Sequence, residues 1–192
     1  MGELDGAHAS LDQLKALALT NYGHFTSMRV ERQRVRGLSL HLERLVRDCQ
    51  TLFKAELDPD RIRKLVRRVV VADPVVVRVT VFDPSLELGN IGSAAEPHVL
   101  VTLRSAVDRP RPPLRVQAVR YERDLPDVKH VGLFGQLWHR RAAQLNGYDD
   151  ALFTDPESYV SEGATWNIGF FRRRSRSLAA GRKVARRDTD VD

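Results

Sequence analysis

A proline-rich stretch near the middle of the chain constrains the fold more than any other feature. Residues 109–113 read Arg-Pro-Arg-Pro-Pro. Each proline fixes φ and removes a backbone donor, so this run favours a stiff, extended connector over a helix or an inner strand. The 192 residues are therefore expected to form two small domains, residues 1–110 and 111–171, followed by a basic tail over residues 172–192.

The first half alternates between helical and strand-like patterns. Val75 to Phe82 is rich in β-branched residues, with Arg78 and Thr80 at alternating positions, as in a half-buried strand. Asp58 followed by Pro59 supplies a helix N-cap and a first-turn proline. The expected helices cover residues 11–19, 38–52 and 59–70, and the expected strands cover residues 25–30, 33–38, 75–82, 98–103 and 114–121. This pattern predicts an α+β domain.

The second half has a helical apolar stripe over residues 134–145, which Gly147 ends. Three strand-like pieces follow at residues 151–153, 158–160 and 166–170. The chain as a whole is predicted to be an α/β (α+β) protein whose second, barrel-like domain is incomplete.

The basic charge is concentrated at the C-terminal end. The formal net charge is +6, and residues 172–192 hold seven arginines and one lysine against three aspartates, a net +5 that leaves +1 for residues 1–171. A solvated, disordered tail is the expectation, and nucleic acid is not an expected partner. No apolar run is long enough to span a membrane, so a soluble cytoplasmic protein is expected, with the single Cys49 in the core.

Lys129 and Glu162 form the most informative pair in the chain. Lys129 stands in Asp127-Val128-Lys129-His130, and Glu162 stands in a run from Tyr159 to Asn167. A lysine amine can form a Schiff base with an aldehyde cofactor, and a carboxylate can hold the proton of a pyridine nitrogen. The pair therefore suits pyridoxal 5'-phosphate. No histidine or cysteine spacing resembles a metal site.

With Arg141 to Gly147, Asp149 to Phe153, Tyr22 to Val30 and His41 to Leu45, these motifs make residues 20–171 resemble the class IV aminotransferases of fold type IV. The resemblance implies that Lys129 is the catalytic lysine and that Glu162 pairs with the pyridine nitrogen. It also implies that Arg44, together with Gly163, Ala164 and Thr165, binds the cofactor phosphate. Phe25 and Arg29 match positions that line the substrate pocket. An amino acid or 2-oxo acid substrate and a homodimer are implied as well.

Several alternatives remain open. Phe134 stands where branched-chain enzymes have a tyrosine, and with the Lys129-His130 pair it favours aminodeoxychorismate lyase, which releases pyruvate and 4-aminobenzoate, as the alternative activity. From Arg172 the apolar periodicity ends, which suggests a C-terminally truncated family member with an impaired phosphate site. A third reading is an inactive relative whose basic tail binds polyanions.

Overall fold

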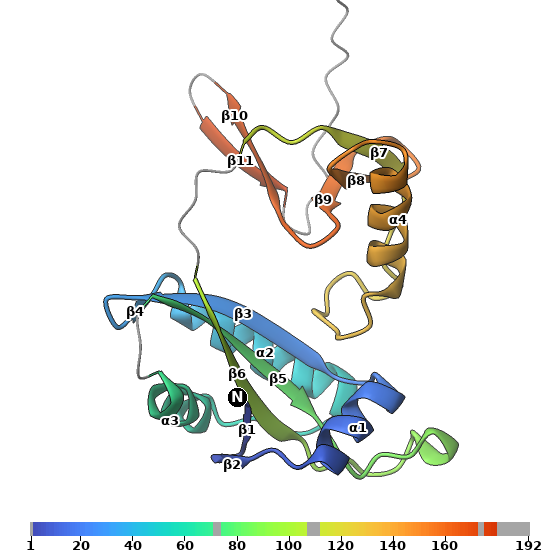
Figure 1. Cartoon of the computed structure of the whole chain (residues 1–192). Coiled ribbons are helices and arrows are strands. Elements are labelled where there is room, and N and C mark those ends of the chain that lie inside the picture. Colours follow the sequence, from blue (N-terminus) through green and yellow to red (C-terminus); the bar gives the residue numbers. More distant parts are fainter. Residues whose placement is uncertain (1, 71–73, 107–111, 173–174, 180–192) are drawn as a thin grey trace, which may run out of the picture. The chain divides into compact units, whose positions relative to one another are not determined.

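The computed structural model describes residues 2–70, 74–106, 112–172 and 175–179 (Figure 1). The chain divides into two compact units. Unit 1 comprises Met1–Arg109 together with Val128–Gly132, and unit 2 comprises Pro110–Asp127 together with Leu133–Asp192. Residues 109–111 of the expected connector lie outside the described residues.

Unit 1 is built on a six-stranded antiparallel sheet with the order β2-β1-β6-β5-β3-β4. The strands are β1 (Gly2–Leu4), β2 (Ala7–His8), β3 (His24–Glu31), β4 (Arg34–Val35), β5 (Val75–Phe82) and β6 (His98–Ser105). The helices are α1 (Leu11–Thr20), α2 (Leu38–Phe53) and α3 (Pro59–Val69), and a short 3-10 helix, η1, spans Leu88–Asn90.

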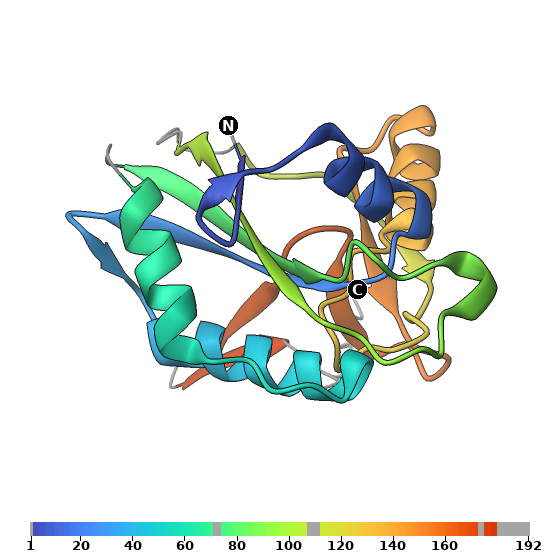
Figure 2. The same ribbon diagram turned by 90° about the horizontal axis from the view of Figure 1, so that it is seen from below.

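The main core of unit 1 lies between the sheet and helices α2 and α3. Alternate residues of β5 point into it, and α2 contributes its apolar stripe, including the wholly buried Leu45 and Cys49. The predicted core position of Cys49 is thereby confirmed. On the opposite face of the sheet, Leu4, Phe82 and Leu100 pack with Leu17 of α1. Figure 2 shows α2 and α3 on one side of these strands and α1 on the other.

Strands β1 and β2 were not expected from the sequence. They are joined at Asp5-Gly6, where both residues have positive φ (51° and 86°), the conformation that tight hairpins favour. The Asp5 carboxylate accepts a hydrogen bond from the Val99 amide at 2.9 Å, which ties the turn to β6. Three residues are too few to show an alternating pattern, so pairing with β6 decides that β1 is a strand.

In unit 2, β7 (Val116–Arg120) runs parallel to β8 (Asp150–Thr154), with α4 (Phe134–Leu145) between them in the chain. A parallel pair requires such a crossover. Strand β9 (Val160–Gly163) pairs antiparallel with β8, and β10 (Ile168–Arg172) pairs with β11 (Ser175–Ala179). Strand β11 falls within the expected tail, of which residues 173–174 and 180–192 lie outside the described residues.

The mixed α/β class predicted from the sequence is confirmed. Within the ranges given above, no helix is both long enough and apolar enough to cross a membrane.

Candidate active site

Lys129 packs with unit 1, although it was expected in the second domain. The Phe25 amide donates to the Lys129 carbonyl at 2.9 Å, and the Val131 amide donates to the Gly23 carbonyl at the same distance. His24 and His130 form an antiparallel bridge between these two bonds. Residues 129–131 therefore extend the antiparallel pairing at the start of β3, which corrects the expected domain of the lysine. Its place depends on pairing with residues more than a hundred positions earlier, which no local pattern encodes.

The lysine amide is bound from the other side by α2. Asp48, wholly buried, accepts the Lys129 backbone N–H on Oδ2 at 2.9 Å. Its Oδ1 accepts from Nη2 and Nε of Arg47, at 2.9 and 3.2 Å. Both backbone groups of Lys129 are thus engaged.

The Lys129 side chain lies over the ring of Phe25, with Nζ 5.1 Å from the ring centroid. The Arg78 guanidinium stacks on the same ring, with Cζ 3.7 Å from the centroid. Burial lowers the pKa of Arg78. The structure therefore gathers two cations on one buried aromatic ring. Arg78 was not selected from the sequence; its local signal was its charge, since the other seven residues of β5 are uncharged.

Arg29 lies on the same face of β3 as Phe25, because the two residues are four positions apart in a strand. Its Nε donates to Glu31 at 3.3 Å. This ion pair is partly exposed, so solvent screens it.

Arg44 on α2 belongs to a small polar cluster with Thr26 and His41. Its Nη2 donates to Thr26 Oγ1 at 2.6 Å, and that hydroxyl lies 2.7 Å from His41 Nδ1. Since an arginine can only donate, the Thr26 proton is directed to His41, whose own proton is then on Nε2. Burial, and then the charges of Arg44 and Lys129, lower the pKa of His41. Arg44 Nε is buried and has no hydrogen-bond partner among the described residues.

Glu162 lies on β9 in unit 2, and its carboxylate is oriented by Arg123. Arg123 Nε donates to Glu162 Oε1 at 2.7 Å, and Arg123 Nη2 donates to the Pro126 carbonyl at 2.7 Å. Both side chains are largely buried, at 16% and 28% exposed. A hydrogen bond between a guanidinium and a carboxylate of this kind fixes the direction of the glutamate side chain. Sequence reasoning did not select Arg123, which is 39 residues from its partner.

The expected phosphate-binding residues after Glu162 form a tight turn. A Cβ on Gly163 would lie 2.1 Å from Trp166 Cε2, so glycine is required for the indole to pack there. The Gly163 amide already donates to the Trp166 carbonyl at 2.9 Å, which leaves it engaged within the turn. Trp166 Nε1 donates to Asp150, and Arg140 Nη1 donates to the Thr165 hydroxyl at 3.2 Å. Ala164 is buried and Thr165 is exposed.

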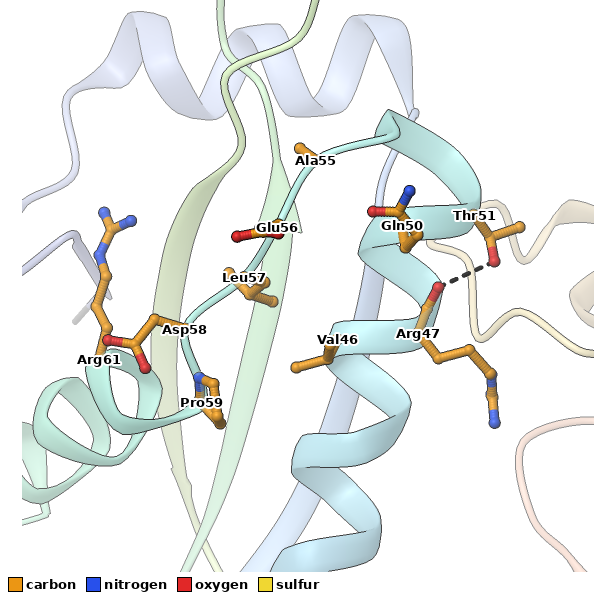
Figure 3. Close-up of a pocket in the computed structure, with 10 residues that line it drawn as sticks. All are labelled: Val46, Arg47, Gln50, Thr51, Ala55, Glu56, Leu57, Asp58, Pro59 and Arg61. Carbon is orange, nitrogen blue, oxygen red and sulfur yellow. Dashed lines mark hydrogen bonds between the residues drawn. The ribbon is translucent and has the colours of Figure 1, made fainter.

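A surface groove in unit 1 lies at the end of α2, the loop after it and the start of α3 (Figure 3). Its lining runs from Val46 to Arg61 and includes none of the residues predicted for the site. Among the described residues, no group of three or more histidine, cysteine, aspartate or glutamate side chains could hold a metal ion.

The family model described as amino-transferase class IV matches residues 23–183, which span the lysine strand, the Arg44 helix and the Glu162 turn. The chain belongs to the class IV aminotransferase family. The matched range includes Lys129, Arg44 and Glu162. A search of curated proteins found no match.

Solved structures of class IV aminotransferase relatives share the fold of this family member. The branched-chain aminotransferase of Thermobaculum terrenum (M4 mutant) has a TM-score of 0.72 at 19% identity, over 92% of this chain and 64% of its own. That of Thermoproteus uzoniensis, solved with norvaline, has 0.69 at 20%, over 91% and 66%. A hypothetical aminotransferase from Mycobacterium tuberculosis in its PLP-bound form has 0.64 at 20%, over 80% and 59%. The chain thus spans about three fifths to two thirds of their lengths.

Proposed function

We propose that this chain is a pyridoxal-phosphate-dependent aminotransferase that moves an amino group between an amino acid and a 2-oxo acid. One observation carries the proposal. Lys129 has both backbone groups engaged and its amine beside a buried ring and a second cation. Family membership and the PLP-bound relative from Mycobacterium tuberculosis support the cofactor.

The residues present fit this cofactor. Arg44 offers a buried guanidinium nitrogen with no hydrogen-bond partner among the described residues, which suits a phosphate oxygen. The Glu162 carboxylate, oriented by Arg123, suits a protonated pyridine nitrogen. Ala164 and Thr165 would add donors to the phosphate, with Gly163 shaping the turn that presents them. When bound, the cofactor ring takes up electrons from the substrate's alpha carbon.

The chain's own residues would then perform the remaining steps. The Lys129 amine would hold the aldehyde carbon of the cofactor and would move a proton at the substrate's alpha carbon. Phe25 forms an apolar wall of the substrate pocket, and Arg29 is proposed to bind a substrate carboxylate. Arg78, stacked on Phe25, offers a further guanidinium for the same purpose.

The test is to incubate the purified chain with pyridoxal phosphate, record the visible absorbance, reduce with borohydride and map the adduct by mass spectrometry. We expect one dominant adduct on Lys129, which Lys129→Ala removes. Lys64→Ala, a change at an exposed lysine of α3, is the matched control and should leave the adduct intact. Equal labelling of several lysines, or no adduct on folded protein, would refute the proposal.

Aminodeoxychorismate lyase remains the second candidate, because Phe134 begins α4 without a hydroxyl and is 78% exposed. If the chain releases pyruvate from aminodeoxychorismate and transfers no amino group to a 2-oxo acid, the lyase activity is the correct one. A folded chain that takes no adduct but binds heparin in a salt-sensitive way would instead favour the inactive, polyanion-binding relative. We also propose that the chain forms a homodimer in the cytoplasm. Light scattering would measure the mass of the dimer.

A further inference from the structure

Asp48 is the one wholly buried carboxylate of α2, and it touches the residue on which the proposed function depends. One oxygen binds the Lys129 amide and the other binds Arg47. We propose that Asp48 is a positioning residue for Lys129: its carboxylate holds the lysine backbone against α2. We call this hydrogen bond the Asp48 anchor, and its role in catalysis rests on the proposed function.

Packing alone does not account for a carboxylate at this position. Burying an ionised carboxylate costs several kcal/mol unless hydrogen bonds and a counter-charge offset the loss of water. An uncharged small residue would let α2 pack on the sheet without that cost. The Arg47 side chain, which supplies the charge, is 59% exposed and reaches in from the surface. The bond to the Lys129 amide is a buried contact that a carboxylate provides and an apolar side chain cannot.

The anchor is needed because of where the lysine lies in the chain. Val128–Gly132 packs with unit 1, while the residues on both sides of it belong to unit 2. The Phe25 amide fixes the Lys129 carbonyl, and Asp48 fixes its amide. With both groups held, only the side-chain rotations remain to place Nζ over the Phe25 ring. A misplacement of about 1 Å can cost on the order of 100-fold in rate, so this constraint matters for chemistry.

The first measurement is hydrogen exchange of peptides covering residues 128–131, on the full chain without cofactor. Asp48→Ala should speed exchange of the Lys129 amide at least about tenfold, because its acceptor is lost. Asp48→Asn keeps an acceptor of the same shape and should lie between Asp48→Ala and the wild type. Arg47→Lys, which leaves both the carboxylate and its counter-charge in place, should change this exchange little. Unchanged exchange in Asp48→Ala would overturn the anchor.

The second measurement is borohydride-trapped adduct on Lys129, normalised to labelling at Lys64 in the same molecule. Asp48→Ala should lower this ratio by about tenfold. Leu45→Ala destabilises α2 without touching Asp48, and should leave the ratio nearly unchanged under conditions where the chain is folded. An equal loss in Leu45→Ala would show a merely structural role and overturn the proposal.

The two measurements separate the proposal from the function on which it rests. If the wild type takes no Lys129 adduct, the proposed function fails, and with it the chemical purpose of Asp48. If the wild type does take the adduct and Asp48→Ala takes it equally well, the proposed function stands and the positioning role is overturned.

Discussion

At the scale of single residues, buried ionisable groups link the stability of unit 1 to pH. The His24 ring is fully buried, and neither ring nitrogen has a hydrogen-bond partner within the described ranges. Burial lowers the pKa of His24 to about 4, with Asp48 opposing the shift. Because the unfolded histidine has a pKa near 6.5, the unfolded chain binds the proton first as pH falls. The free energy of unfolding therefore has its full value, as far as His24 is concerned, above about pH 6.5. It decreases as the pH falls from there toward pH 4.

The expected loss is about 3 kcal/mol over that interval, from about 1.4 kcal/mol for each pKa unit. Urea unfolding at pH 7, 6, 5 and 4 measures it. His24→Leu should flatten this dependence, whatever its effect at pH 7, while His8→Gln on the exposed β2 should leave it unchanged. Equal pH dependence in wild type and His24→Leu would contradict the assignment.

Cys49 should be chemically silent in the folded chain. Its side chain is wholly buried among Leu45 and other core residues, and burial raises the pKa of the thiol to about 11. The thiolate is the reactive form, so native protein should react with dithiobis(nitrobenzoate) at least about 100-fold more slowly than protein in urea. Stopped-flow absorbance at pH 8 measures both rates. Rapid labelling of native protein would show that α2 opens locally.

At the scale of elements, α2 packs its apolar residues into the core of unit 1 and also carries Arg44 and the buried Asp48, which contact β3 and Lys129. Leu45→Ala should destabilise unit 1 by about 2–5 kcal/mol, since the residue is wholly buried. Leu40→Ala, on the same helix but 69% exposed, should change stability by less than about 0.5 kcal/mol. Urea midpoints of the two variants give the comparison. Similar costs would mean that α2 does not pack as described.

Some helices and strands could be predicted from the sequence because their own residues carry the pattern. Strand β5 has the predicted bounds, Val75–Phe82, because six of its eight residues are β-branched and this local pattern is enough to predict a strand. Helix α3 begins at Pro59 after Asp58, whose side chain caps the helix as predicted. Strands β1 and β2, which were not predicted, have three and two residues. Such short pieces carry no periodicity, and their neighbours in the sheet decide them.

At the scale of the whole molecule, cofactor binding should stabilise the folded chain. A ligand that binds only the native state adds about 2.7 kcal/mol at 100 times its dissociation constant. Urea unfolding with and without saturating pyridoxal phosphate should show this shift in the wild type, and a much smaller one in Lys129→Ala. An equal shift in both would mean that the cofactor binds elsewhere on the chain.

The sequence by itself determined the main helices and strands, the mixed α/β class and the family, because periodicity and short motifs are local properties of the chain. It also selected Lys129 and Phe25, which the structure places 5.1 Å apart from Nζ to ring centroid. Only the tertiary structure decided the partners of these residues. Asp48 lies 81 positions from Lys129, and Arg123 lies 39 positions from Glu162. Such contacts depend on how strands pair and how α2 packs on them, which no local pattern in the sequence encodes.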